Sequence, residues 1–342
     1  MHSSLPSPEP SLLPDAPTPS RIPLGAVRVP LIDDSTEPLR AQGEAEFRPI
    51  VVRTLLNRNA NRALPFFWTI NPYRGCEFDC GYCYARYTHE FLGHEDTSLF
   101  ARRIYVKLEA AEALRRSLRG DTLRGRPVAM GTATDPYQPA EKHWGISRAV
   151  LEVLEREPDL DLSITTKSPL VLRDLDLLRR LASRNAVTVN ITITTLNRDL
   201  ARILERGAPT PQRRLETIRT LAEAGIPTAI YVMPILPEIT DHAEELLRLL
   251  RAARKMGATI ACGNTLHLQA APRRSLMPIL ERHFADRVAR YRSLYRDSHL
   301  APSTVRDAIH ARFDALRRAL GFAERGPRRP VDDTQLSFDF GV

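Results

Sequence analysis

The sequence predicts an α/β fold, in the form of a partial (β/α)6 barrel of the TIM type. Three observations predict it. Six short strand-like segments alternate with amphipathic segments between residues 63 and 268. No seventh and eighth strand follow, so the pattern falls short of a closed eight-stranded barrel. Residues that carry chemistry come directly after the strand-like segments, where parallel α/β folds place their sites.

The predicted strands are short and rich in β-branched or aromatic residues. They are expected at residues 66–70, 127–130, 162–165, 187–194, 228–233 and 259–261. The fourth alternates apolar and polar residues, as expected for a strand with one face against helices and the other in a wet cavity. Its polar face carries Thr188, Asn190, Thr192 and Thr194.

Helices are expected between these strands. Leucines recur at helical spacing in residues 170–182 and 241–256, which predicts two amphipathic helices. A rhythm of strand, helix and strand implies right-handed parallel crossovers.

We divide the chain into five segments. Residues 1–30 are proline-rich and predict a disordered leader, followed by an N-terminal arm at 31–62. The core is expected at residues 63–268, a helical and basic C-terminal extension at 269–331, and a flexible tail at 332–342. A chain of 342 residues with 43% hydrophobic residues is long enough to bury one large core.

Three of the four cysteines, Cys76, Cys80 and Cys83, fall within eight residues. Thiolates this close indicate a metal site rather than disulfides. Structural zinc sites and most [4Fe–4S] clusters take four protein ligands, so this run leaves one position open. His89 and His94 are candidates for completing a zinc tetrahedron, but the second C-x2-C or H-x3-H pair of structural zinc modules does not appear.

At these residues the chain resembles the radical S-adenosylmethionine (SAM) superfamily. The signature of that family is C-x3-C-x-aromatic-C, and Tyr82 stands at the aromatic position. The flanks at residues 71–76 and 82–86, the stretch 131–139 and the triplet 166–168 look like the spore photoproduct lyase-like group. The likeness runs from about residue 65 to about residue 268.

The resemblance implies a radical enzyme. Cys76, Cys80 and Cys83 would hold a [4Fe–4S] cluster, and SAM would chelate the fourth iron. Reduction of the cluster would then cleave SAM to a 5′-deoxyadenosyl radical, which abstracts hydrogen from a substrate. A protein in this role holds, orients and shields its cofactors.

The resemblance and the positions of the loops also give candidate SAM contacts. Tyr82 would cover the adenine, Lys167 would meet the carboxylate, and the 131–135 run would meet the amino group. The candidate cofactor contacts are Tyr82, Thr132, Thr134, Asp135, Lys167, Ser168, Thr192 and Thr194.

Several of these residues have an alternative interpretation. Asp135 precedes a proline and suits the start of a helix as well as an ammonium ligand. Arg74 and Arg86 flank the cysteines and either neutralise the cluster or contact substrate. Spore photoproduct lyase uses a cysteine after its second strand as a hydrogen donor, whereas this chain has Thr132 there, which argues against photoproduct repair. The fourth cysteine, Cys262, lies on the sixth strand and is expected to be a buried thiol.

The formal net charge is +8, and arginine carries most of the excess. Together with the lyase-like motifs, this favours a nucleic-acid base as one candidate substrate, with a small molecule or peptide as the other. A metal-stabilised nucleic-acid-binding module without catalysis is a third hypothesis.

The surroundings of the protein can also be inferred. A radical SAM reaction would need an electron donor such as a flavodoxin or ferredoxin. No apolar run approaches the ~18 residues of a membrane span, and no secretion signal is recognisable. Together with the oxygen-sensitive thiolates, this predicts a cytoplasmic protein without membrane partners.

Overall fold

The computed structural model describes residues 38–42, 45–61 and 64–323. The predicted leader at 1–30 and tail at 332–342 lie outside the described residues. The chain therefore shows its core, most of the arm and most of the C-terminal extension.

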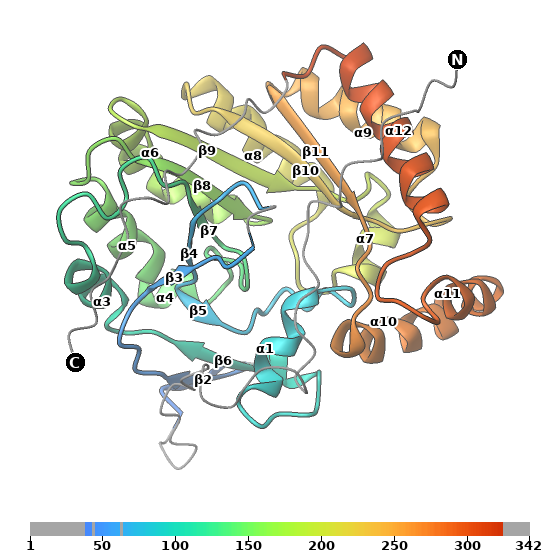
Figure 1. Cartoon of the computed structure of the whole chain (residues 1–342), viewed down its shortest axis with the longest axis horizontal. Coiled ribbons are helices and arrows are strands. Elements are labelled where there is room, and N and C mark those ends of the chain that lie inside the picture. The colour runs from blue at the N-terminus through green and yellow to red at the C-terminus, as the bar shows by residue number, and fades with distance from the viewer. Residues whose placement is uncertain (1–37, 43–44, 62–63, 324–342) are drawn as a thin grey trace, which may run out of the picture.

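The main sheet has seven strands in the order β11-β10-β9-β8-β7-β4-β3. All neighbours pair in parallel except β3, which runs antiparallel to β4. The two edge strands, β11 and β3, do not pair with each other, so the sheet stays open (Figure 1). Its strands are β3 (Leu56–Arg58), β4 (Trp68–Ile70), β7 (Val128–Met130), β8 (Asp161–Thr166), β9 (Ala186–Thr192), β10 (Thr228–Ile235) and β11 (Ile260–Thr265).

The prediction of six parallel strands is therefore confirmed, with each strand within a few residues of its expected position. Alternation along β9 places Val187, Val189 and Ile191 in the hydrophobic core. The opposite face carries Asn190, whose amide donates to Ser163 Oγ at 2.7 Å and to Thr165 Oγ1 at 3.0 Å on β8. A dry outer face and a polar inner face follow from the period of two along a strand.

Helices cover the outer face of this sheet (Figure 1). Leucines at helical spacing pack them onto the strands, for example Leu246, Leu249 and Leu250. The covering helices are α5 (Ile146–Leu154), α6 (Leu175–Ala182), α8 (Pro211–Glu223) and α9 (Ala243–Lys255).

The helix predicted at 170–182 begins differently. Its first turns form the 3-10 helix η3 (Pro169–Asp174), and α6 follows directly. Ser168 caps this element by accepting from the Leu170 amide at 3.2 Å, and Pro169 occupies the first position, where a missing amide proton costs nothing.

A second, four-stranded sheet lies beside the first and was not predicted. Its order is β1-β2-β6-β5, with bounds β1 (Arg40–Gln42), β2 (Ala45–Pro49), β5 (Tyr73–Arg74) and β6 (Arg103–Val106). The predicted arm supplies β1 and β2 here and β3 to the main sheet, so it is built into both sheets.

The shorter helices and the C-terminal extension complete the fold. The helical prediction for the extension is confirmed by α10, α11 and α12. Phe313 of α12 packs against Gly263 of β11, and Ile279 of α10 lies against Gly81 of the cysteine loop. The remaining bounds are η2 (Tyr84–Arg86), α1 (Tyr87–Glu90), α2 (Leu99–Arg102), α3 (Ala110–Ser117), α4 (Glu141–Trp144), α7 (Arg198–Leu204), α10 (Ala270–His283), η4 (Ala285–Arg287), α11 (Val288–Leu294) and α12 (Ser303–Ala319).

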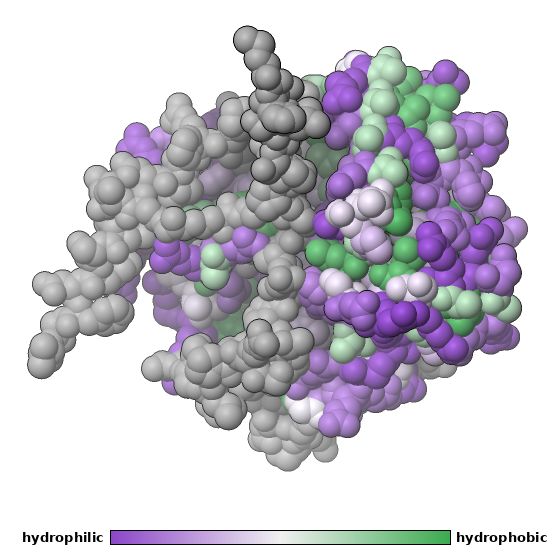
Figure 2. Space-filling model, turned by 45° about the vertical axis from the view of Figure 1, so that its right-hand side comes forward, coloured by the Kyte–Doolittle hydropathy of each residue, from purple (hydrophilic) through white to green (hydrophobic). Residues whose placement is uncertain are grey.

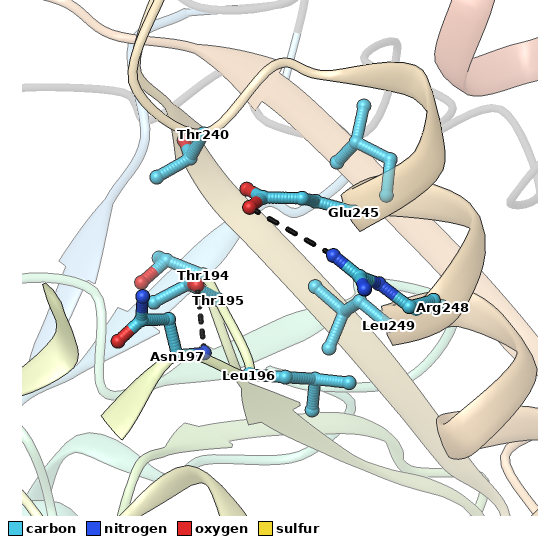
Figure 3. A pocket seen from close by; sticks show the side chains of 9 residues that line it. Thr194, Thr195, Leu196, Asn197, Thr240, Glu245, Arg248 and Leu249 are labelled. Carbon is cyan, nitrogen blue, oxygen red and sulfur yellow. Dashed lines mark hydrogen bonds and ion pairs between the residues drawn. The ribbon is translucent and has the colours of Figure 1, made fainter. Parts of the chain in front are cut away.

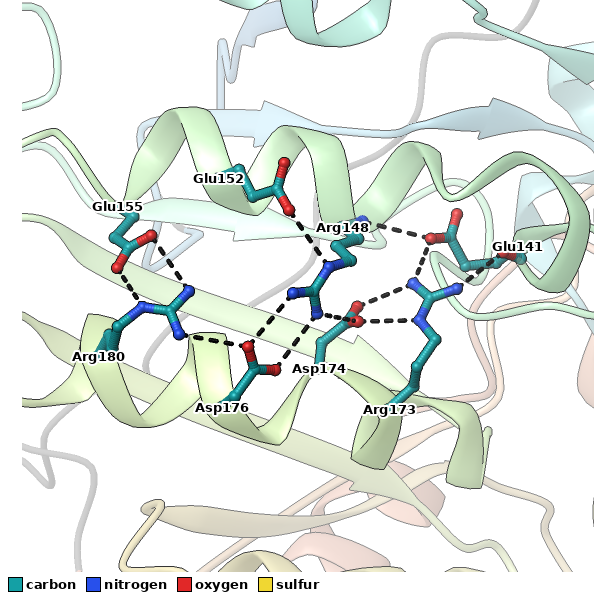
Figure 4. Close-up of polar contacts among 8 residues, drawn as sticks. All are labelled: Glu141, Arg148, Glu152, Glu155, Arg173, Asp174, Asp176 and Arg180. Atoms are coloured by element: carbon teal, nitrogen blue, oxygen red, sulfur yellow. Dashed lines mark hydrogen bonds and ion pairs between the residues drawn. The ribbon is translucent and has the colours of Figure 1, made fainter.

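Two buried carboxylates fasten α4, α5 and η3 together (Figure 4). The Glu141 side chain is fully buried and accepts from Tyr73 at 2.5 Å and from Arg173 at 2.7 Å. Asp174 is equally buried and pairs with Arg148 at 3.0 Å and with Arg173 at 2.8 Å. Each buried charge thus has an opposite charge and further hydrogen bonds, which its burial requires.

None of the helices in the described part of the chain is both long enough and apolar enough to cross a bilayer.

Candidate active site

The three cysteines lie on one loop between β5 and η2. Two backbone hydrogen bonds fix this loop. Within it, the Cys83 amide donates to the Cys80 carbonyl at 3.1 Å, and the Cys76 amide joins it to α2 by donating to the Phe100 carbonyl at 2.9 Å. Gly75 precedes the loop with φ +87°, and a Cβ there would come 2.8 Å from the Phe100 carbonyl oxygen. Only glycine adopts this conformation at such close approach without strain.

The thiols share one neighbourhood. Cys76 and Cys80 are buried, and Cys83 is partly exposed. Burial raises the pKa of the Cys76 thiol, and the nearby Asp135, Cys80 and Cys83 raise it further. The three predicted ligands therefore lie close to one another and to Asp135, one of the predicted SAM contacts.

The Arg86 side chain is hydrogen-bonded to the cysteine loop. Its guanidinium is 3% exposed and donates to the Cys80 carbonyl at 2.9 Å, to the Thr97 carbonyl at 2.7 Å and to Asp79 at 2.6 Å. Its donors are used within the fold, which favours support of the loop over substrate contact for this arginine.

The loop after β7 lies against the cysteine loop. Thr134 donates its hydroxyl to the Gly75 carbonyl at 2.6 Å, and Gln138 donates to the same carbonyl at 3.2 Å. Thr132 bonds the Asn71 amide at 3.1 Å through its hydroxyl, and its carbonyl accepts from Tyr84. The hydroxyls predicted to meet SAM therefore also join the two loops.

Asp135 ties the same loop to the end of β8. Its carboxylate accepts from Thr166 Oγ1 at 2.6 Å, from the Lys167 amide at 2.7 Å and from the Tyr137 amide at 2.9 Å. Burial raises its pKa, while these donors oppose the shift. Because a carboxylate offers about four acceptor positions, one is left on Oδ2 for a further donor.

Lys167 and Tyr82 face each other across the centre of the site. The Lys167 ammonium lies 5.8 Å from the centroid of the Tyr82 ring, within the range of a cation–π contact. Burial lowers the pKa of Lys167, but Cys80 and Glu205 outweigh it and the pKa lies above its usual range. The amine is therefore a lasting positive charge beside the cysteine loop.

The end of β9 contributes Thr192 and Thr194, both buried. The Thr192 carbonyl accepts from Arg214 at 3.0 Å, and the Thr194 hydroxyl donates to Glu205 at 3.2 Å. Glu205 and Arg214 were not predicted as site residues. Arg214 left one signal in the sequence, since it stands on the apolar face of α8 with Leu215, Ile218 and Leu221; Glu205 left none.

The two histidines are turned to other partners. Each histidine has a hydrogen-bond partner outside the cysteine loop: His89 Nε2 lies 2.9 Å from the Arg103 carbonyl, and His94 Nε2 lies 2.6 Å from the Tyr105 hydroxyl. Among the described residues, no three His, Cys, Asp or Glu side chains form the ligand set of a single metal ion. The Nε2 atoms of both histidines thus have partners within the fold.

A pocket of about 380 Å³ opens next to this site, between the loop after β9 and the start of α9 (Figure 3). Thr194, Thr195 and Asn197 line one side. Glu245 and Arg248, 3.9 Å apart, line the other with Thr240. The pocket shares Thr194 with the Glu205 network.

An open parallel α/β sheet, with three cysteines on the loop that follows β4 and the short strand β5, is an architecture that suits an enzyme with an iron–sulfur cluster at the carboxyl ends of its strands. The sequence profile of the Radical SAM superfamily matches residues 70–250. The chain belongs to the radical SAM superfamily, and it is an enzyme that uses a [4Fe–4S] cluster and SAM. This excludes the hypothesis of a non-catalytic binding module.

Relatives and solved structures agree with this family. Uncharacterized protein Rv2578c of Mycobacterium tuberculosis is 36% identical over 90% of this chain and 86% of its own length. Uncharacterized protein MJ0683 of Methanocaldococcus jannaschii is 31% identical over 51% of this chain and 62% of its own.

Among solved structures, a mutant of spore photoproduct lyase superposes with a TM-score of 0.61 at 17% identity, covering 80% of this chain and 79% of that one. The same enzyme complexed with dinucleoside spore photoproduct gives 0.59 at 16% identity, with the same coverage. The resemblance to the spore photoproduct lyase-like group is thereby confirmed for the fold.

Proposed function

We propose that this radical SAM enzyme abstracts hydrogen from a base or nucleotide of a nucleic acid. When bound, the cluster and SAM supply a 5′-deoxyadenosyl radical. The chain itself binds, orients and shields these groups. The observation that carries the substrate assignment is a pair of cations beside the cysteine loop, Arg74 and Lys107, that lack a carboxylate partner among the described residues.

The cofactor assignments belong to the same proposal. Cys76, Cys80 and Cys83 hold the cluster, Tyr82 covers the adenine, and Lys167 pairs with the SAM carboxylate. Asp135, through its remaining acceptor position, takes the amino group together with Thr132 and Thr134. Ser168, Thr192 and Thr194 are the remaining proposed SAM contacts. The Ser168 hydroxyl also caps η3, and the Thr194 hydroxyl also donates to Glu205.

The two cations suit a phosphate. Lys107 is 8% exposed and donates to the Asn71 carbonyl at 2.6 Å, and Arg74 has a buried Nη1 without a hydrogen-bond partner. Burial, together with the charge of Arg74, lowers the pKa of Lys107 to about 7. Two buried like charges are costly unless an anion joins them, and a nucleotide brings one.

Asn71 links Lys107 to the loop after β7. Asn71, which accepts from Lys107, bonds Thr132, and the Thr132 carbonyl accepts from the half-exposed Tyr84. A base flipped out of its helix, entering past Tyr84, would carry its phosphate toward Arg74 and Lys107. The fold supports this class of substrate, because one of the similar solved structures is spore photoproduct lyase complexed with dinucleoside spore photoproduct. Thr132, which lacks a thiol hydrogen, argues for a reaction other than that repair.

The proposal is tested by anaerobic incubation with SAM, a reductant and separate pools of single-stranded DNA, duplex DNA and RNA. We expect one pool to increase the yield of 5′-deoxyadenosine and to bind with an affinity that falls as salt rises. Lys107→Met should weaken that binding severalfold and reduce its salt dependence by about one phosphate contact.

The matched control is Arg119→Ala. It removes an exposed guanidinium that follows the C-terminal end of α3 in the sequence. It should leave binding unchanged. No affinity for any nucleic acid, or equal affinity in the Lys107→Met protein, would contradict the nucleic-acid assignment.

A small-molecule or peptide substrate is the second candidate, because two observations favour it. The pocket at Thr194 has a volume suited to a small ligand. The arginine groups on α2, α3 and α10 pair with carboxylates, as in Arg102–Asp96, Arg115–Glu112 and Arg274–Glu90. On the face in Figure 2, hydrophilic residues are interspersed with small apolar patches. Stimulation of 5′-deoxyadenosine formation by a metabolite or peptide fraction alone would select this candidate.

The proposed reaction also needs a reductant of low potential. A flavodoxin or ferredoxin in the cytoplasm is the proposed donor, since the cluster requires a reducing compartment.

A further inference from the structure

Beneath the cysteine loop lies an ion pair with almost no exposure. Arg214 Nη2 donates to Glu205 Oε2 at 2.5 Å, and the two side chains are 1% and 0% exposed. Burial by itself raises the pKa of Glu205, but Arg214 and Lys167 outweigh it and the pKa lies below its usual range. Because a buried ion pair adds little stability over apolar side chains of the same size, its placement here indicates another role.

The other atoms of this pair reach the working parts of the site. Glu205 Oε1 accepts the hydroxyl of Tyr82 and that of Thr194. Arg214 Nη1 donates to the Thr192 carbonyl at 3.0 Å, and its Nε donates to the Pro209 carbonyl at 2.8 Å. One carboxylate thus joins the aromatic residue of the cysteine motif to the end of β9 and to α8.

Backbone hydrogen bonds also join the cysteine loop to residues 204–207. The Gly81 amide donates to the Leu204 carbonyl at 2.9 Å, and the Gly207 amide to the Phe78 carbonyl at 3.0 Å. Between them, Cys80 and Glu205 form an antiparallel bridge. The segment 204–207 is therefore a short backbone ribbon along the loop that carries the cysteines.

The charges alternate across this region. Arg214 neutralises Glu205, and Glu205 in turn interacts with Lys167 and lies beside Cys80. Lys167 faces the ring of Tyr82, whose hydroxyl is bonded to Glu205. The hydrogen bond to Glu205 fixes the direction of the ring axis, because the phenol oxygen lies on the line through Cβ and Cζ and moves when χ1 changes.

We propose that Glu205, held by Arg214, is a positioning residue that sets the orientation of Tyr82 and of the cysteine loop, and thereby the affinity of the cluster site for SAM. The inference rests on the proposed assignment of Cys76, Cys80 and Cys83 as cluster ligands. It adds a pair of residues that do not themselves touch the cluster.

The test uses the full chain, reconstituted without oxygen, and compares Tyr82→Phe and Glu205→Gln with wild type. Iron content, SAM affinity, the electron paramagnetic resonance spectrum with and without SAM, and urea unfolding are measured. We expect both variants to keep their iron, to bind SAM about tenfold more weakly, and to show a smaller or broader SAM-induced change in the spectrum.

The chain contains a matched control. Tyr73 also donates to a fully buried glutamate, Glu141, which also pairs with an arginine, Arg173, but Tyr73 packs in the core of the main sheet and not in the cluster of buried residues around the cysteines. Tyr73→Phe should lower stability as Tyr82→Phe does, while SAM affinity and the spectrum stay as in wild type. Tyr82→Phe removes one oxygen only, so it decides the question even where Glu205→Gln, which leaves Arg214 unpaired, fails to fold.

Two outcomes would overturn the inference. Tyr82→Phe with unchanged SAM affinity and spectrum would leave a purely structural role for Glu205. An equal loss of SAM affinity in Tyr73→Phe would show a general effect of stability. A wild-type protein that retains no iron would instead overturn the ligand assignment, which distinguishes the failure of the proposed function from the failure of this inference.

Discussion

Lys167 shows how one side chain is placed by its neighbours. Its amide is bonded to Asp135 and its ammonium faces Tyr82, so both ends of the residue are fixed at the rim. We expect Lys167→Ala to weaken SAM binding at least tenfold, because a hydrogen bond to a charged group contributes about 1.5–3 kcal/mol. Calorimetric titration of the reconstituted protein measures the effect. Lys142→Ala, which removes an exposed lysine, is the control, and equal affinities in the two variants would refute the role.

His89 predicts a pH dependence of stability. Its imidazole is 1% exposed, and burial is the main cause that lowers its pKa to about 4 from 6.5. The folded protein therefore keeps it neutral, while the unfolded chain binds a proton below about pH 6.5. The contribution, on the order of 3 kcal/mol, is complete above pH 6.5 and is lost as the pH falls toward 4.

Urea unfolding at pH 7.5 and pH 5.0 checks this expectation. His89→Gln should be less stable than wild type at pH 7.5 but should lose less stability on acidification. His283→Gln, at an exposed position, should follow the wild-type curve. Parallel curves for wild type and His89→Gln would show that another group controls the acid limb.

At the scale of elements, the connection between α7 and α8 packs closely against the cysteine loop. A Cβ on Gly207 would overlap the Glu77 carbonyl oxygen, which is backbone and cannot move aside cheaply. We expect Gly207→Ala to lower the iron retained after reconstitution and to destabilise the fold by about 1–3 kcal/mol, as overpacking does. Iron analysis and urea unfolding measure both effects.

Gly120→Ala is the matched comparison for that substitution. Gly120 has φ +51°, and a Cβ there would meet no atom within 4 Å, so only backbone strain of about 1 kcal/mol applies. It should keep its full iron content. Full iron content in Gly207→Ala as well would mean that the connection yields to the extra methyl group.

On the scale of the whole molecule, four distant parts of the chain converge on the cysteine loop. The β7 loop bonds Gly75, α2 accepts from Cys76 through the Phe100 carbonyl, the 204–207 segment pairs with it, and α10 packs on Gly81. The proposed cluster site therefore lies where the two sheets and the C-terminal helices meet. Loss of the cluster should therefore destabilise segments outside the cysteine loop as well.

We expect removal of the cluster by a chelator to lower the melting temperature and to increase amide hydrogen exchange in the cysteine loop and in residues 204–207. The outer helices α5 and α6 should keep their protection, because leucines hold them to the sheet. Cys262→Ser, on β11, should retain iron and behave like wild type, whereas Cys80→Ser should resemble the chelated protein. Iron loss in Cys262→Ser would mean that the ligand set is wrong.

Local patterns were sufficient for the fold class and for the cofactor. The alternation in β9 and the leucine spacing in α9 follow from the periods of strand and helix, which neighbouring residues alone determine. The cysteine spacing and Tyr82 are likewise contiguous in the chain. The second sheet was missed because β5 and β6 are short and pair across about thirty residues, beyond the reach of any local period.

By itself, then, the sequence determined a parallel α/β enzyme with a three-cysteine loop, since periodicity and ligand spacing are properties of contiguous residues. Tertiary structure alone decided what stands around that loop. Glu205 lies 123 residues from Tyr82, and Lys107 lies 36 residues from Asn71. Such contacts depend on how helices and loops close in space, and burial, which gives a charged residue its importance here, exists only in the folded chain.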